Sequence, residues 1–118
     1  MPEPFFSVIL VSWNSGKYLP RCLDSLDKQT FRDFEVVIVD NGSTDGSLDG
    51  IAEKYPRLKF RIRELGSNYG FSTANNMGVQ IAHGPWAALL NTDAFPAPDW
   101  LEVLAQAIAR FGDQCVYA

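Results

Sequence analysis

Residues 36–45 read VVIVDNGSTD, in which four consecutive apolar residues lead directly into a run of small and polar ones. An apolar run without alternation is typical of a strand covered on both faces of a parallel sheet. Similar runs occur at residues 5–11 and, in shorter form, at residues 87–90. Residues 58–63 instead alternate apolar and basic side chains, which predicts a half-exposed strand at an edge of the sheet.

Four stretches of helical periodicity alternate with these strands. Their apolar residues recur at i, i+3, i+4 and i+7. The four stripes are Leu19, Cys22, Leu23 and Leu26; Leu48, Ile51, Ala52 and Tyr55; Ala74, Met77, Gly78 and Ile81; and Leu101, Leu104, Ala105 and Ile108. Right-handed crossovers then give a three-layer α/β/α sandwich with a mainly parallel, Rossmann-like sheet. We also expect Asp99 and Glu102 to form a capping box, and Val116-Tyr117 to begin another strand.

Length and composition limit the classes of protein to consider. The 118 residues suit one domain, and 10 basic residues against 14 acidic ones give a net charge of -4. No basic run is present to neutralise phosphates, so we expect no nucleic-acid partner. Cys22 and Cys115 fit no metal-ligand spacing, and the apolar run near the amino terminus is too short for a signal peptide or membrane span. We therefore expect a cytoplasmic protein, peripheral at the inner membrane face in its full-length form.

Polar and small residues follow every predicted strand, at residues 12–16, 40–45, 66–70 and 91–93. Ligands of open parallel sheets bind beyond the carboxyl ends of the strands, so these segments predict a binding site. Neither GxGxxG nor GxxxxGK[ST] follows the first strand. An NAD-dependent oxidoreductase and a P-loop phosphotransferase are therefore disfavoured.

Four blocks of this sequence resemble the family 2 glycosyltransferases. They are VILVSWN at 8–14 with LDSL at 23–26 and Gln29-Thr30; VIVDNGSTDGS at 37–47; NYGF at 68–71 with Asn75-Asn76 and Gly78; and LLNTD at 89–93 with PDWL at 98–101. They occur in the family's order across nearly the whole chain. The resemblance implies a GT-A fold, with residues 1–118 forming its nucleotide-sugar-binding half and the acceptor-binding half absent.

The activity that this resemblance implies is transfer of a sugar from a nucleoside diphosphate sugar to an acceptor hydroxyl, with inversion and with the help of a metal ion. Family members carry the general base on a later segment, so the catalytic base is unknown here and the chain alone is expected to be inactive. The acceptor, a glycan or a lipid-linked one, would bind through the missing half. The alternative is a non-catalytic nucleotide-binding or assembly module of the same fold. A nucleotidyltransferase is disfavoured because residues 12–16 contain no basic side chain.

The block at residues 91–93 matches the metal-binding motif of the family, usually written DxD. Its first position is Asn91 here, so Asp93 is the only acid of the triplet. Mg²⁺ and Mn²⁺ prefer hard oxygen ligands and use few protein carboxylates, so we expect Asp93 to bind one of these cations. Asn91 and Thr92 are expected to contact the nucleotide sugar. The alternative for Asp93 is an Asx-turn before the proline-rich segment.

The other site residues also follow from the resemblance. Asp40 matches the acid that accepts a hydrogen bond from the nucleobase, with a helix cap as its alternative. Val11 and Trp13 match residues of the base pocket, although Trp13 suits a core position equally well. We expect Asn14 to tie its loop to neighbouring segments.

The third block departs from the family pattern. Many relatives with a uridine donor carry Arg where Asn75 stands before Asn76, and its absence resembles the rhamnosyltransferase branch, with a deoxythymidine diphosphate donor. Galactofuranosyl and mannosyl transfer remain open, and the donor is expected to be of the deoxythymidine or uridine type. Gly70 is expected to let the chain turn near the phosphates, as is Gly66.

Two expectations concern parts outside this site. His83 is expected at a helix carboxyl terminus, with a favourable contact to the helix dipole. A sheet that lacks further strands would expose an edge, so we expect a homo-oligomer that pairs there.

Overall fold

The computed structural model describes residues 3–111, which contain four strands and four helices in strict alternation. The strands are β1 (Phe6–Ser12), β2 (Phe34–Asp40), β3 (Phe60–Glu64) and β4 (Trp86–Asn91). The helices are α1 (Leu19–Asp27), α2 (Ile51–Lys54), α3 (Phe71–Ile81) and α4 (Trp100–Phe111). The predicted α/β order is confirmed; the expected strand at Val116-Tyr117, like Cys115, lies outside the described residues.

All neighbouring strands of the sheet run parallel, in the order β3-β2-β1-β4. β3 is therefore an edge strand, as its alternating sequence predicted. In the register of the sheet Ser12 pairs with Asp40, and Val11 pairs with Asn91. The carboxyl ends of β1, β2 and β4 consequently meet at one end of the sheet, together with the polar segments that follow them.

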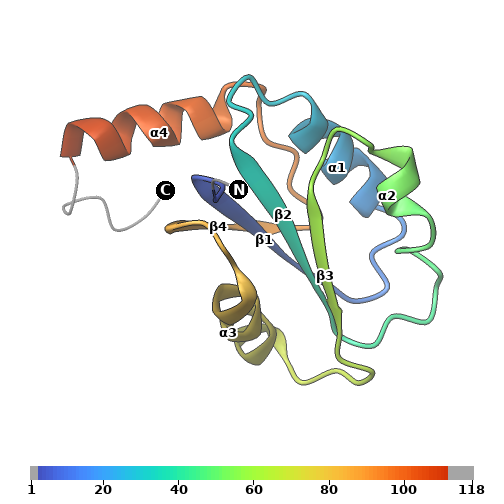
Figure 1. Cartoon of the computed structure of the whole chain (residues 1–118). Coiled ribbons are helices and arrows are strands. Elements are labelled where there is room, and N and C mark those ends of the chain that lie inside the picture. Colours follow the sequence, from blue (N-terminus) through green and yellow to red (C-terminus); the bar gives the residue numbers. More distant parts are fainter. Residues whose placement is uncertain (1–2, 112–118) are drawn as a thin grey trace.

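Helices cover both faces of the sheet, which confirms the three-layer architecture (Figure 1). Side chains of α1, α2 and α4 join one cluster of buried apolar residues, whereas α3 packs on the opposite face through Ala74. Gly78 explains how α3 approaches the sheet so closely. A Cβ atom at this position would lie 2.6 Å from Ile9 Cγ2, so the glycine that weakens the helical pattern is required by packing.

Helix α2 is shorter than the sequence pattern predicts. Leu48 and Tyr55 pack against the core as expected, but the helix itself covers only Ile51–Lys54. Gly50 precedes it with φ of 69°, a left-handed conformation that cannot continue into a preceding helical turn. Apolar periodicity therefore placed Leu48, Ile51 and Tyr55 on the buried side correctly, whereas Ala52 is exposed and the predicted helix length is wrong.

The start of α4 is fixed by another element of the chain. Gln29 follows α1, and its Oε1 accepts a hydrogen bond from the Leu101 backbone N–H at 3.0 Å while its Nε2 donates to the Ala97 carbonyl at 2.7 Å. Glu102 accepts a hydrogen bond from the Thr30 hydroxyl at 2.9 Å. The predicted capping box is therefore not what the structure shows, because Glu102 bonds Thr30 and a buried glutamine satisfies the helix start.

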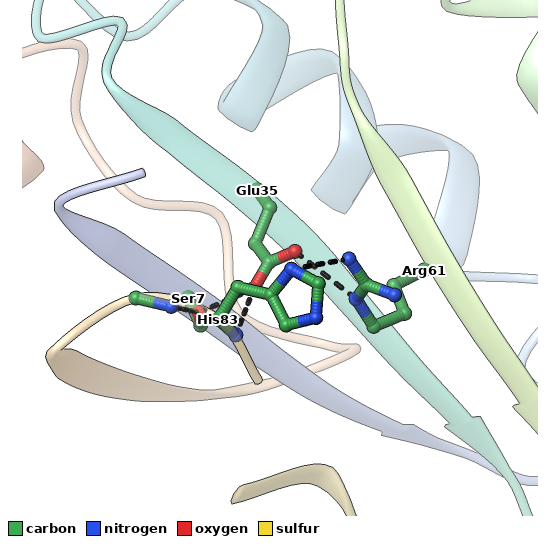
Figure 2. Close-up of polar contacts among 5 residues, drawn as sticks. Ser7, Glu35, Arg61 and His83 are labelled. Carbon is green, nitrogen blue, oxygen red and sulfur yellow. Dashed lines mark hydrogen bonds and ion pairs between the residues drawn. The ribbon is translucent and has the colours of Figure 1, made fainter. Parts of the chain in front are cut away.

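A polar cluster around the buried Glu35 ties three strands together at the amino end of the sheet (Figure 2). We call it the Glu35 cluster, and its members are Ser7, Glu35, Arg61, His83 and Gly84. Glu35 accepts hydrogen bonds from the Ser7 hydroxyl at 2.6 Å, from the His83 backbone N–H at 2.7 Å and from Arg61 Nε at 3.3 Å. The Ser7 hydroxyl in turn accepts a bond from the Gly84 backbone N–H at 2.8 Å.

The electrostatics of this cluster favour an ionised Glu35. Burial raises the pKa of the carboxyl, but the hydrogen bonds from Ser7, His83 and Arg61 and the charge of Arg61 outweigh it, and the pKa is lowered. The His83 ring nitrogen Nδ1 lies 2.8 Å from an Arg61 nitrogen, which can only donate. His83 therefore contacts Arg61 beyond the end of α3, and the predicted contact with the helix dipole is not the one it makes.

No helix within residues 3–111 is both long enough and apolar enough to cross a membrane.

Candidate functional site

A cavity of about 450 Å³ opens at the carboxyl ends of β1, β2 and β4, where the strand register brings the polar segments together. The residues that line it come from the β1–α1 loop, the ends of β2 and β4, and the segment before α3. They are Val11, Trp13, Asn14, Ser15, Tyr18, Asn41, Asn68, Phe71, Asn91, Thr92 and Asp93. The cavity therefore lies where the sequence predicted a binding site.

The β1–α1 loop is held in place by the loop that follows β2. Asn14 has a left-handed backbone, with φ of 48°, and its N–H donates to the Ser43 hydroxyl at 2.8 Å. Its side-chain oxygen accepts from the Thr44 backbone N–H, also at 2.8 Å. The expected structural role of Asn14 is confirmed, and the loop presents the side chains on either side of it to the cavity.

Trp13 is the largest side chain of the cavity wall and is 55% exposed. This exposure excludes the alternative in which Trp13 belongs to the core. Val11, two residues earlier in the sequence, lines the same cavity and is half-buried. The two residues offer an apolar surface against which a flat ring can stack.

Asn91, the last residue of β4, lines the wall together with Thr92 and Asp93, which follow it directly. The Thr92 hydroxyl donates to the Ser15 hydroxyl at 3.1 Å, which joins this segment to the β1–α1 loop. Asp93 is exposed, and its carboxylate makes no hydrogen bond or ion pair with another residue in the range 3–111. The Asx-turn alternative therefore finds no support, and the carboxylate is available to a ligand.

The single open carboxylate fits a hard divalent cation. Mg²⁺ commonly uses one or two protein carboxylates and completes its shell with water and phosphate oxygens. Within residues 3–111 no group of three or more His, Cys, Asp or Glu could enclose an ion without such help. Burial, and secondarily the charge of Asp93, raises the pKa of the neighbouring Cys22 thiol to about 12, so this sulfur is protonated near neutral pH.

Asp40 lies outside the cavity wall. It is 4% exposed, and its two oxygens accept hydrogen bonds from the Ser43 backbone N–H at 2.9 Å and from the Ser43 hydroxyl at 2.5 Å. These contacts organise the turn after β2. They do not cap a helix, because α2 begins only at Ile51 and its start at Gly50 has no side-chain cap hydrogen bond. The capping alternative is therefore wrong, and the predicted contact of Asp40 with a nucleobase stays a prediction. The next residue, Asn41, lines the cavity instead.

Gly70 and Asn75 also lie outside the wall. Gly70 precedes α3 with φ of 90°, and Gly66 has φ of 76°, so both glycines serve the backbone geometry that we expected. Asn75 lies within α3 and is 8% exposed. Neither residue lines the cavity, so their predicted contacts with a ligand stay predictions.

Comparison with known proteins identifies the family to which this chain belongs. The sequence model described as Glycosyl transferase family 2 matches residues 7–118, nearly the whole chain. The chain belongs to glycosyl transferase family 2. The resemblance of the four sequence blocks is thereby confirmed, although nothing distinguishes a rhamnosyltransferase branch.

Relatives of this family 2 chain share its sequence and its fold. A PGL/p-HBAD biosynthesis glycosyltransferase of Mycobacterium bovis is 43% identical over 94 residues, which cover 79% of this chain and 37% of that protein. The crystal structure of S. aureus TarS in complex with UDP-GlcNAc has a TM-score of 0.82 and 36% identity, covering 89% of this chain and 31% of the other. The mannosyltransferase PcManGT from Pyrobaculum calidifontis, in complex with GDP-Man and Mn²⁺, has a TM-score of 0.81 and 29% identity, covering 98% and 34%.

The fold of this family 2 chain is thus that of GT-A glycosyltransferases. The chain spans only about a third of the length of the matched chains, 37% of the mycobacterial protein and 31% of the TarS chain of residues 1–349.

Several wall residues of this family 2 cavity were not singled out from the sequence. They are Ser15, Tyr18, Asn41, Asn68 and Phe71. Asn41, Asn68 and Phe71 belong to blocks that carried the resemblance, and their positions beyond strand ends were a usable signal. What the sequence could not supply is the direction in which each side chain points.

Proposed function

We propose that this family 2 chain forms the donor-binding half of an inverting glycosyltransferase, and that its cavity holds a nucleoside diphosphate sugar. The observation that carries the proposal is the open carboxylate of Asp93 in the same cavity as the exposed ring of Trp13. A carboxylate and an aromatic face are the complements of a cation-bound diphosphate and of a nucleobase. The related structures contain UDP-GlcNAc in TarS and GDP-Man with Mn²⁺ in PcManGT, which supports a ligand of this class.

Each wall of the cavity has its own part in this proposal. Trp13 and Val11 stack on and enclose the base, which is of the deoxythymidine or uridine type. Asn91 and Thr92 hydrogen-bond the sugar or the diphosphate, and Asp93 binds Mg²⁺ or Mn²⁺. When bound, the cation neutralises the charge that develops on the diphosphate leaving group.

The residues behind the wall contribute indirectly. Asp40 holds the turn after β2 through Ser43, so it shapes the side of the cavity on which the base lies. Gly70 and Asn75 belong to the start of α3, and we assign them to the diphosphate side. The acceptor hydroxyl attacks the anomeric carbon, its proton passes to a base, and the nucleoside diphosphate leaves with the electrons of the broken bond. We assign that base and the glycan or lipid-linked acceptor to none of the described residues.

The test is to measure the affinity of the chain for UDP, deoxythymidine diphosphate and GDP by titration calorimetry, each with and without Mn²⁺. We expect binding that strengthens with Mn²⁺, and a loss of about tenfold in affinity in Asp93→Ala, roughly 1.4 kcal/mol. Asp99→Ala is the matched control, because Asp99 is equally exposed and does not line the cavity. If Mn²⁺ strengthened nucleotide affinity equally in Asp93→Ala and in the unaltered chain, Asp93 would not be a ligand of the cation.

The alternative of a non-catalytic nucleotide-binding module is favoured by Asn91, which stands where the family motif has an acid. Both functions predict nucleotide binding, so binding cannot separate them. Turnover by the longest natural form of the protein, compared with its Asp93→Ala variant, decides between them. Sugar transfer that depends on Asp93 supports the enzyme, whereas nucleotide binding without transfer supports the module.

A further inference from the structure

The segment between β3 and α3 crosses the end of β2, where a backbone bond from the Leu65 N–H to the Asp40 carbonyl and one side chain hold it. Asn41 follows β2 directly and is 3% exposed. Its Nδ2 donates a hydrogen bond to the Gly70 carbonyl at 3.2 Å, and its Oδ1 accepts one from the Tyr69 backbone N–H, also at 3.2 Å. A single amide group thus engages a donor and an acceptor on adjacent residues of the crossing segment.

The neighbouring glycine shows how closely the two loops pack. A Cβ atom at Gly42 would lie 3.0 to 3.2 Å from three backbone atoms of Ser67, and φ of Gly42 is +86°. The space above Gly42 is therefore occupied by the main chain of the crossing segment. Asn68 then turns the segment towards α3, because its Oδ1 accepts from the Gly70 backbone N–H at 2.9 Å.

Few other contacts hold this segment in position. Residues 66–70 are all exposed, and the Tyr69 and Phe71 side chains are each 59% exposed. Asn68 and Phe71 nevertheless form part of the cavity wall. The placement of Asn68 and Phe71 consequently depends on the two hydrogen bonds of Asn41 to the residues between them.

We propose that Asn41 is a positioning residue, whose amide clasps Tyr69 and Gly70 and thereby sets the Asn68–Phe71 wall of the donor cavity. That the ligand is a nucleotide rests on the proposed function, whereas the clasp is a property of the free chain. The chemistry requires an amide, because the group must donate and accept at once. A carboxylate could accept from Tyr69 but would face the Gly70 carbonyl without a proton, in a place shielded from water.

This requirement gives the clasp a pH signature when Asn41 is replaced by aspartate. A protonated carboxyl group has nearly the shape of the amide and can donate its O–H to the Gly70 carbonyl. In Asn41→Asp the clasp should therefore be broken at pH 8 and re-formed in acid, as the carboxyl binds a proton. Burial and the facing carbonyl both favour the protonated form, which brings the recovery within a practical pH range.

The experiment combines amide hydrogen exchange by NMR with affinity for UDP in Mn²⁺, for the unaltered chain, Asn41→Asp and Gln106→Glu. Gln106 is exposed on α4, so Gln106→Glu is the same amide-to-carboxylate change away from the cavity. At pH 8 the repulsion between the Asn41→Asp carboxylate and the Gly70 carbonyl should push the segment away and break the Tyr69 bond with it. We therefore expect Tyr69 N–H exchange to be faster by about tenfold and UDP affinity to be weaker by about tenfold. At pH 5.5 the Tyr69 exchange rate and the UDP affinity of Asn41→Asp should both return towards those of the unaltered chain. In Gln106→Glu both quantities should stay close to those of the unaltered chain at either pH.

A second measurement needs no variant and remains decisive if Asn41→Asp does not fold. In the unaltered chain the Tyr69 amide should exchange at least about tenfold more slowly than the Ser67 and Asn68 amides, which donate no hydrogen bond within residues 3–111. Equal exchange of the three amides would overturn the clasp.

The remaining outcomes separate this proposal from the proposed function. Faster Tyr69 exchange in Asn41→Asp with unchanged UDP affinity would overturn the positioning role. An affinity loss in Asn41→Asp that does not recover in acid would do the same. If the unaltered chain bound none of the three nucleotides, the proposed function would fail and the cavity role with it, yet Tyr69 exchange would still decide the clasp.

Discussion

The two ends of the sheet carry similar polar residues and use them in opposite ways. At the amino end, Glu35 is 5% exposed, and hydrogen-bond donors from β1, β3 and the α3–β4 connection surround its carboxylate. At the carboxyl end, Asp93 is exposed and engages no other residue within the range 3–111. One carboxylate is satisfied by the fold, and the other is left for a ligand.

The difference teaches how to separate structural from functional acids in a parallel sheet. Glu35 is the second residue of β2 and Asp93 follows the end of β4, so each lies near a strand end. A buried carboxylate must be satisfied internally or it destabilises the protein, whereas an exposed one is satisfied by water until a ligand replaces it. Asp40 shows that position alone does not decide, because it lies at the functional end and yet is buried and engaged by Ser43.

The largest expected effect is on stability, at the closed end. Glu35→Ala leaves the Ser7 hydroxyl and the His83 N–H without their acceptor, and it removes the ion-pair partner of Arg61. We expect the free energy of unfolding to fall by about 3 kcal/mol, as measured by urea denaturation at pH 7. Asp93→Ala should change it by less than about 0.5 kcal/mol, because no internal contact is lost.

Glu64→Ala is the control for the loss of an acid from the sheet, since Glu64 is an exposed residue of β3. It should leave the free energy of unfolding nearly unchanged. If Glu35→Ala and Asp93→Ala cost the same, the two ends would not differ in the way that their contacts indicate.

The next effect concerns binding at the open end. Trp13→Ala removes an exposed aromatic face from the cavity wall, and stacking of a base on such a ring contributes roughly 1 kcal/mol. We therefore expect affinity for a nucleoside diphosphate to fall by about fivefold to tenfold, measured by calorimetry. The free energy of unfolding should stay within about 0.5 kcal/mol.

Phe111→Ala removes another exposed aromatic ring, 52% exposed at the end of α4, and should leave the affinity unchanged. A loss of stability in Trp13→Ala without a loss of affinity would place Trp13 with the structural residues. It would also revive the core alternative that its exposure argues against.

The sequence predicted the fold well because the fold depends on periodicity. Uninterrupted apolar runs identified β1 and β2, and alternation identified the edge strand β3. The length of α2 could not be predicted in the same way. The left-handed backbone of Gly50 delays the start of the helix to Ile51, and apolar periodicity does not report backbone conformation. Gln29 at the start of α4 is a contact between distant segments, which no local motif encodes.

The candidate site was predicted less completely than the fold. Placing polar segments at strand ends located the cavity and its Trp13 and Asp93, because topology alone brings those ends together. It did not distinguish Asp40 from Asn41, which are adjacent in sequence and point to different surroundings. The side-chain direction at the end of a strand depends on how the chain turns, and here that turn is fixed by Ser43.

The smallest effect we predict is a pH dependence at the closed end. The pKa of Glu35 is lowered in the folded chain from its ordinary value of 4.5, so the folded state binds the proton less readily than the unfolded one. The resulting stabilisation is fully present above pH 4.5 and is lost as the pH falls through the folded-state pKa. Glu35→Gln cannot ionise, and its stability gap to the unaltered chain should therefore narrow as the pH falls from 7 towards 3. Urea denaturation followed by circular dichroism at several pH values measures this gap, in which the contributions of the other acids cancel. A gap that stays constant in acid would mean that the contacts of Glu35 do not favour its ionised form, and that a neutral side chain satisfies the closed end equally well.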